Sequence, residues 1–199
     1  MKILWIDCET TGFDEKRHAI IQLACILDDG KGNIIDELNL YMKPFLGDDI
    51  SKDALEANGT TMEDLRSDHY MPPVSAFTKF IEFMSKYVNK YDSDDKVILA
   101  GKNVKFDIGF LRRLFDKCDD NYYGSWFHYP SIEVESEIAK WMVLENAVAL
   151  NYKLETLCDH FEIPICDTHN GYEDIVATFK LYYKLEDHWL DRLRESIER

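Results

Sequence analysis

The sequence has few cysteines, no long apolar run and little positive charge. Its five cysteines are an odd number without a C-x-x-C pair, which argues against a disulfide framework and a structural zinc site. No stretch approaches the roughly 18 consecutive apolar residues of a membrane span, and the N-terminal MKILWIDCETTG lacks the order of an export signal. We therefore expect an unexported, cytoplasmic protein in a reducing compartment, without a membrane partner.

The scarcity of positive charge restricts the possible partners. The chain has 23 basic and 38 acidic residues, for a net charge of -15, and this excess repels polyanions at long range. A cluster of carboxylates can nevertheless bind divalent cations, which invert the charge that a phosphate meets. Composition alone favours the simpler explanation of a soluble, self-repelling surface, and it predicts weak binding of any nucleic acid without metal.

The hydrophobic pattern predicts a single α/β domain over residues 1–199. A chain of 199 residues with 46% hydrophobic content can bury one core. Short apolar runs predict strands at 2–6, 20–27, 34–40 and 97–100, and helical spacing predicts helices at 51–57, 61–65, 74–91, 104–115, 132–144, 153–161 and 173–195. The aromatic-rich segment 121–130 is expected to be a loop. The succession of strands and helices indicates an α/β layer.

Two acidic residues mark the end of the first predicted strand. Asp7 and Glu9 are two positions apart, so the alternation of a strand places both carboxylates on one face. Carboxylate oxygens are the ligands that magnesium and manganese prefer. A lone D-x-E pair is more often a solvent-facing pair, but here Thr10, Thr11 and Gly12 follow, and Gly12 permits close approach of the backbone to a ligand.

Three further polar residues lie where helices begin. Asp107 is one turn into the helix after Gly101, Asp174 is in the first turn of the last helix, and His169 is in the loop before it. Taken singly, each residue has a structural explanation that is as good as or better than a role in a site. These are helix-dipole stabilisation for Asp107, a helix cap for Asp174 and a surface-loop histidine for His169. A carboxylate on an apolar helix face needs a partner, however, and a metal ion is one that all the acids can share.

Three motifs occur in order: D-x-E at 7–9, N-x-x-F-D at 103–107 and H-x-x-x-x-D at 169–174. This pattern resembles the DEDDh, or DnaQ-like, exonuclease family, which includes the proofreading subunit of DNA polymerase III. The likeness extends to 50–55 with 58–59 and to 154–164, and thus covers nearly the whole chain. One motif arises easily by chance, but three in order with compatible strand and helix contexts do not.

The resemblance implies a ribonuclease-H-like α/β fold, with a five-stranded mixed β-sheet flanked by helices on both faces. It implies two divalent ions, Mg²⁺ or Mn²⁺, and a histidine base for hydrolysis at a single-stranded 3′ end. The implied ligands are Asp7, Glu9, Asp107 and Asp174, the implied base is His169, and the implied substrate contacts are Thr10, Thr11, Gly12, Phe13 and Asn103. Phe13 is expected to stack on the last base. Lys102 stands where many relatives have histidine.

The sequence leaves several alternatives open. The polymer is expected to be DNA, but an exoribonuclease that trims RNA 3′ ends is the main rival, because the 2′-hydroxyl is the key discriminator and no motif reads it. A noncatalytic module that holds a protein partner through the acidic face or the 122–129 aromatic loop is a weaker alternative. Core packing is the favoured role of those aromatic rings. A polymerase or other protein partner is not indicated by any segment.

Overall fold

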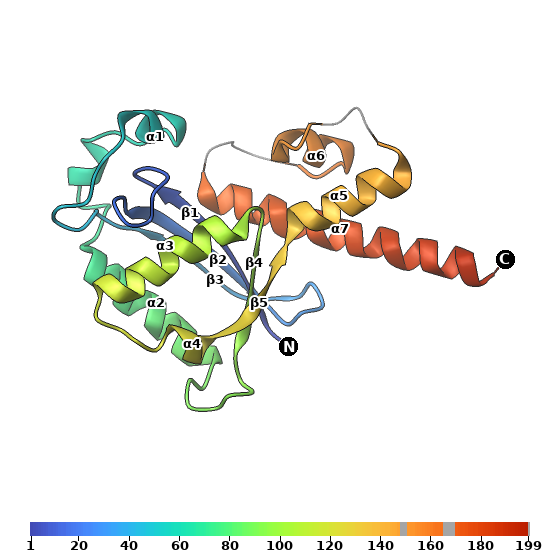
Figure 1. Cartoon of the computed structure of the whole chain (residues 1–199), viewed down its shortest axis with the longest axis horizontal. Coiled ribbons are helices and arrows are strands. Elements are labelled where there is room, and N and C mark those ends of the chain that lie inside the picture. The colour runs from blue at the N-terminus through green and yellow to red at the C-terminus, as the bar shows by residue number, and fades with distance from the viewer. Residues whose placement is uncertain (148–150, 165–169, 199) are drawn as a thin grey trace.

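The computed structural model describes residues 1–147, 151–164 and 170–198. A mixed sheet lies between two layers of helices (Figure 1). Its strands are β1 (Ile3–Thr10), β2 (Ile20–Asp28), β3 (Ile34–Tyr41), β4 (Val97–Gly101) and β5 (Phe127–Glu133), in the order β3-β2-β1-β4-β5. β1 is antiparallel to β2 and parallel to β4. The predicted five-stranded mixed sheet is therefore confirmed.

Helices cover both faces of this sheet. They are α1 (Lys52–Ala57), the 3-10 helix η1 (Asp64–Arg66), α2 (Pro73–Tyr87), α3 (Val104–Lys117), α4 (Tyr123–Trp126), α5 (Val134–Glu145), α6 (Leu154–His160) and α7 (Gly171–Ile197). One hydrophobic cluster joins α2 and α3 to the sheet, and another joins α5, α6 and α7 to its other face (Figure 1). The helices flanking both faces match the expectation.

The central strand β1 sets the position of the acidic pair. Leu4 and Ile6 belong to the cluster with α2 and α3, whereas Trp5 belongs to the cluster with α7. Trp5 packs edge-on against Phe179 of α7, with ring centroids 5.7 Å apart. Because side chains alternate, the next residues on the α7 side are Asp7 and then Glu9.

Several element predictions need correction. β1 continues to Thr10, beyond the apolar run at 2–6, so the two acids predicted at the end of the strand lie within it. The predicted helix at 61–65 is a 3-10 turn at 64–66. α2 ends at Tyr87, before the predicted 91. The expected loop at 121–130 instead contains α4 and most of β5. Pro130 obscured β5 in the sequence, but a proline is tolerated there because β5 is an edge strand.

Within the described ranges, none of the helices combines the length and the apolar character needed to cross a membrane.

Candidate active site

Asp7 is the centre of a group of interacting carboxylates. Burial raises its pKa well above the ordinary value, and the neighbouring charges of Asp107, Glu9 and Asp174 raise it further, in that order. The Lys102 ammonium acts in the opposite direction. Residues from β1, α3 and α7 are thus electrostatically coupled to one side chain, although they are far apart in the sequence.

Asp107 reaches the strand from α3. It is 4% exposed, and its Oδ1 accepts a hydrogen bond from the backbone N–H of Cys8 at 2.8 Å. Burial raises the pKa of Asp107 to about 7 despite that hydrogen bond, and the charge of Glu9 also raises it. The same hydrogen bond ties the first turn of α3 to the end of β1.

Glu9 has a partner that the sequence interpretation did not assign to the site. Burial, followed by the charge of Asp174, raises the pKa of Glu9 to about 7, whereas a hydrogen bond from the Asn58 side chain lowers it. Asn58 follows α1, and its Nδ2 also donates to the carbonyl of Thr10 at 3.1 Å. Asn58 therefore links α1 to the carboxylate and to the backbone beside it.

The start of α7 lies directly against β1. Asn170 caps the helix by accepting from the backbone N–H of Tyr172, and Gly171 follows. A Cβ at Gly171 would lie 3.0 Å from Oδ2 of Asp7, so glycine permits this close approach. Asp174 lies in the same first turn and is half-buried. His169, the predicted base, lies outside the described residues.

The donor set fits divalent cations. Carboxylates that hold one another's pKa values high repel when ionised, and cations remove that repulsion. In the part of the chain that the structure describes, no three acidic, histidine or cysteine side chains are close enough to form a complete metal site. The oxygen-only ligands suit magnesium or manganese.

The loop after β1 is held by internal contacts. Thr10 donates its hydroxyl to the carbonyl of Gly12 at 2.7 Å, and the fully buried Thr11 donates to the carbonyl of Asp49 at 2.7 Å. A Cβ at Gly12 would meet the His18 ring at 2.3 Å. These hydroxyls shape the loop, and the space at Gly12 is filled by a side chain of the protein rather than open to a ligand.

Two other predicted substrate contacts lie on the surface. Phe13 is 81% exposed, so its ring is available for stacking. Asn103 is exposed, has a left-handed backbone with φ of 58°, and donates its backbone N–H to Glu133 at 2.7 Å. Its side chain does not cap α3. Both residues are therefore exposed to solvent.

A five-stranded mixed sheet that brings acidic residues from β1, α3 and α7 together has the arrangement that the sequence resemblance implies for a nuclease. Residues 4–182 match the family described as Exonuclease, and the chain belongs to this family. The prediction of a DnaQ-like exonuclease is thereby confirmed, and enzymes of this kind depend on metal ions.

The chain is similar in sequence to several named proteins. The chain is 30% identical to ribonuclease T of Shewanella oneidensis, covering 92% of this chain and 81% of that protein. It is 29% identical to DNA polymerase III PolC-type of Oceanobacillus iheyensis over 90% of this chain, but spans only 11% of that much longer relative. It is 27% identical to the mitochondrial oligoribonuclease of Saccharomyces cerevisiae, covering 98% and 70% of the two chains.

Solved structures support the ribonuclease-H-like fold. Escherichia coli exonuclease I in complex with a dT13 oligonucleotide superposes with a TM-score of 0.74 at 21% identity, covering 98% of this chain and 43% of that one. A zinc-bound form of the same enzyme with single-stranded DNA gives a TM-score of 0.75 at 20% identity, covering 98% and 42% of the two chains.

Proposed function

We propose that the chain is a metal-dependent 3′→5′ exonuclease that releases nucleoside 5′-monophosphates from single-stranded 3′ ends, with DNA as the favoured polymer. The observation that carries this proposal is that the pKa values of Asp7, Glu9 and Asp107 are all raised, first by burial and then by the charges of neighbouring carboxylates. Asp174 contributes to the shifts of two of them. Perturbed carboxylates at the end of a central strand are typical of a functional site.

In this proposal Asp7, Glu9, Asp107 and Asp174 hold two divalent ions, Mg²⁺ or Mn²⁺. Such ions lower the pKa of bound water and stabilise the leaving oxygen. His169 accepts the proton of the attacking water, because a histidine with a pKa near 6.5 is largely neutral at cytoplasmic pH.

Other side chains have supporting roles. Asn58 orients the Glu9 carboxylate through its hydrogen bond. Phe13 stacks on the terminal base through its exposed ring. Thr10, Thr11 and Gly12 maintain the loop that carries Phe13, and Asn103 contacts the terminal nucleotide.

The test uses Asp7→Asn, which removes one ligand with little change in size. We expect the wild-type chain to shorten 5′-labelled oligonucleotides stepwise with Mg²⁺ or Mn²⁺, and to be inactive with chelator. Because a neutral amide is a poor ligand for a hard cation, the variant should lose metal-dependent hydrolysis. Normal hydrolysis by Asp7→Asn would remove this residue from the site.

A second variant tests the histidine. His169→Ala should lower turnover by roughly 10² to 10⁴ because it removes the general base, and metal binding measured by calorimetry should be largely retained. Unchanged single-turnover rates would show that another group accepts the proton.

An RNA substrate is the alternative, since relatives of this chain include ribonuclease T and oligoribonuclease. Digestion of matched DNA and RNA oligonucleotides under one set of conditions decides between the polymers. A chain that binds no Mg²⁺ or Mn²⁺ by calorimetry would instead be a noncatalytic module on the same fold.

A further inference from the structure

A series of hydrogen bonds connects Glu9 to a segment that is remote in the sequence. Asn58 donates a hydrogen bond to the Glu9 carboxylate, and its Oδ1 accepts one from the backbone N–H of Thr60 at 3.2 Å. The Thr60 side chain in turn has a hydrogen bond with Tyr70. We call Glu9, Asn58, Thr60 and Tyr70 the Tyr70 network. It runs from a proposed metal ligand on β1 to a part of the fold beyond η1.

The contacts of Asn58 determine which way its amide points. Its Nδ2 donates to the carbonyl of Thr10 at 3.1 Å, and its Oδ1 accepts from the backbone of Thr60. A flipped amide would put its oxygen against that carbonyl and its NH₂ group against the N–H of Thr60, so it would lose both hydrogen bonds. The Glu9 carboxylate therefore meets a donor, and never an acceptor, on this side.

Tyr70 is fixed both through its ring and through the backbone beside it. It is 7% exposed and belongs to a small hydrophobic cluster with Ile21 of β2 and Leu55 of α1. Its ring packs edge-on against that of Tyr41, with ring centroids 5.4 Å apart. The next residue, Met71, donates its backbone N–H to the carbonyl of Tyr41 at 3.1 Å. Tyr70 is thus anchored on the end of β3.

The pairing of the strands places this anchor at the same edge of the sheet as the carboxylates. Glu9 pairs with Gln22 of β2, and Gln22 pairs with Tyr41 of β3. Directly paired residues have Cβ atoms about 5 Å apart, so the three side chains form one row across the sheet. Burial raises the pKa of Tyr70, and the charge of Glu9 is among the smaller causes that raise it further.

A hollow of about 500 Å³ lies beside the Tyr70 network. Asn58, Thr60 and Tyr70 all line it, together with Asn170 at the start of α7. Because this space is open, close packing does not restrain the network on that side, and the hydrogen bonds determine how its side chains point. Removal of one hydrogen bond is therefore expected to change the orientation of Glu9 without compensation from packing.

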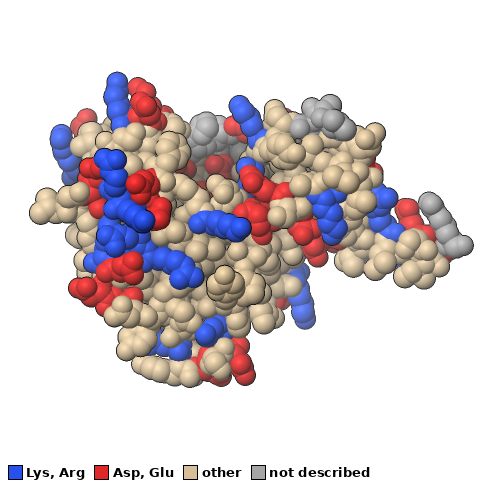
Figure 2. All heavy atoms as spheres, viewed as in Figure 1, with Lys and Arg blue, Asp and Glu red and all other residues tan. Residues whose placement is uncertain are grey.

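The partner that α1 provides for Glu9 is neutral. Burial and the charge of Asp174 raise the pKa of Glu9, and among the described residues only the hydrogen bond from Asn58 is found to lower it. Lys52 of α1 lies 3.9 Å from Glu56 of the same helix, and Figure 2 shows basic and acidic side chains together over α1 at the upper left. An amide orients the Glu9 carboxylate but leaves its negative charge available to a divalent cation.

We propose that Tyr70 is a positioning residue, which acts through Thr60 and Asn58 to hold the Glu9 carboxylate in the orientation that binds a divalent cation. Side chains that orient a metal ligand without touching the metal contribute to the affinity of the site. This inference rests on the proposed exonuclease function, and it deepens that function by giving a role to a segment outside the three sequence motifs.

The test is Tyr70→Phe, which removes the hydroxyl and keeps the ring. We expect the Kd for Mn²⁺, measured by calorimetry, to rise about 10-fold, because Glu9 loses its fixed orientation. The Mn²⁺ concentration that gives half of the maximal rate should rise by the same factor, whereas a purely structural defect would lower the melting temperature without changing that concentration. Thr60→Val should have the same effect as Tyr70→Phe, and Thr60→Ser, which keeps a hydroxyl, should behave as the wild type.

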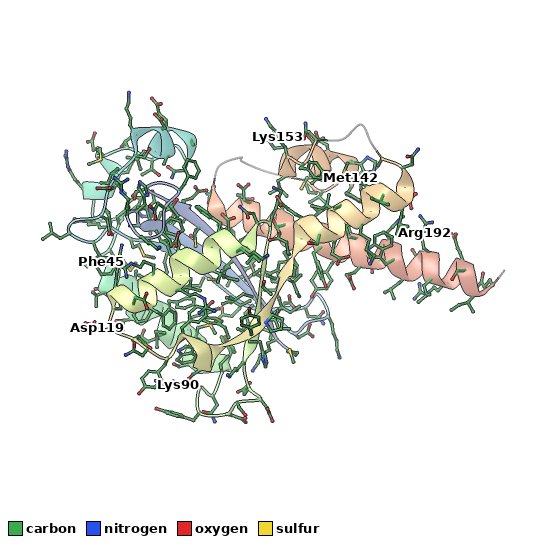
Figure 3. The ribbon with its side chains drawn as sticks, viewed as in Figure 1. Phe45, Lys90, Asp119, Met142, Lys153 and Arg192 are labelled. Carbon is green, nitrogen blue, oxygen red and sulfur yellow. The ribbon has the colours of Figure 1, made fainter. Side chains whose placement is uncertain are left out.

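Tyr123→Phe in α4 is the matched control, because the Tyr123 side chain also has a hydrogen bond with another side chain, that of Arg112. α4 lies at the opposite end of the molecule from α1, and in Figure 3 it is found beside Lys90 at the lower edge. This control should leave the Kd for Mn²⁺ unchanged. In a Glu9→Gln background, Tyr70→Phe should weaken Mn²⁺ binding no further, because the two residues act on the same interaction.

Metal binding separates this inference from the proposed function, since calorimetry needs no hydrolysis. If Tyr70→Phe and Thr60→Val bind Mn²⁺ with the Kd of the wild type, Tyr70 does not position Glu9. The same conclusion follows if Tyr70→Phe weakens binding equally with and without the Glu9 carboxylate. If the wild type binds Mn²⁺ and Tyr70→Phe weakens that binding, but no strand is hydrolysed, only the exonuclease proposal fails. Melting temperatures with chelator establish that each variant is folded.

Discussion

At the scale of single residues, Gly171 controls how closely α7 approaches the acidic cluster. The position that a Cβ would occupy lies 3.0 Å from Oδ2 of Asp7, which is tighter than ordinary van der Waals contact. Gly171→Ala should therefore displace the carboxylate or the first turn of α7 and lower kcat about 10-fold, because small misplacements in an active site are costly.

The control for this substitution is Gly124→Ala in α4, where an added methyl group meets nothing within 4 Å. Alanine favours helices, so neither variant should lose much thermal stability. Equal kcat values for the two variants would show that the close approach of α7 to Asp7 is not needed for catalysis.

Short motifs single out the four carboxylates in the sequence, and the structure brings them into electrostatic contact, while their role as metal ligands stays a prediction. Asn58 and Gly171 were not assigned to the site from the sequence. Their roles depend on a hydrogen bond and an approach distance between segments that are remote in the chain. Such contacts exist only in the folded molecule, and a single sequence contains no signal for them.

At the scale of elements, a buried amide fixes the start of α7 on the sheet. Gln22 of β2 is 4% exposed, and its Nε2 donates to Oδ1 of Asn170 at 3.1 Å and to Oδ1 of Asn39 at 3.0 Å. Gln22→Met keeps the volume but leaves the Asn170 oxygen without this donor. We expect kcat to fall about 10-fold with KM unchanged, since roughly 1.4 kcal/mol corresponds to that factor.

Asn39→Ala is the matched control, because Asn39 accepts from the same amide but belongs to the edge strand β3 and not to α7. It should leave kcat and the melting temperature unaltered. If both variants lose activity equally, the Gln22 amide stabilises the sheet as a whole and does not specifically position the start of α7.

The predictions of helices and strands were most accurate where a regular hydrophobic pattern extended over many residues. α2, α3 and α7 have extended apolar faces and were found, although their ends shifted by a few residues. β5 was missed, because it pairs only with β4 and its sequence lacks a regular alternation. Pairing with a neighbour stabilises such an edge strand, and local propensity alone does not reveal it.

For the whole molecule, the acidic cluster predicts an unusual pH dependence of stability. The folded pKa values of Glu9 and Asp107 are about 7, above the ordinary values near 4, so the folded state favours their protonated forms. The stability that this contributes is complete at low pH and is lost as pH rises through about 7. With chelator, the melting temperature should therefore fall by roughly 5 °C between pH 5.5 and pH 8.

Calorimetric scans with and without Mg²⁺ check this expectation. Metal at pH 8 should restore the melting temperature, since it binds the folded state. Asp107→Asn should flatten the pH dependence without metal. Surface carboxylates with lowered pKa values, such as Asp36 and Asp95, are ionised in both states over this range and do not contribute to the slope. A wild-type melting temperature that does not change between pH 5.5 and pH 8 would show that the pKa values of Glu9 and Asp107 are not raised in the folded state.

We also propose that residues 1–199 act as a single exonuclease domain. One sheet runs through the described residues, with a hydrophobic cluster on each face. The matched family region spans residues 4–182 and so includes β1 as well as most of α7.

The long separation between Asp7 and Asp174 has a consequence for the cell that makes this chain. Asp7 and Glu9 leave the ribosome before their partner on α7, which follows all five strands of the sheet. A nascent or prematurely terminated chain therefore lacks one proposed ligand and the histidine together. In the proposed mechanism, hydrolysis therefore begins only after α7 has been synthesised.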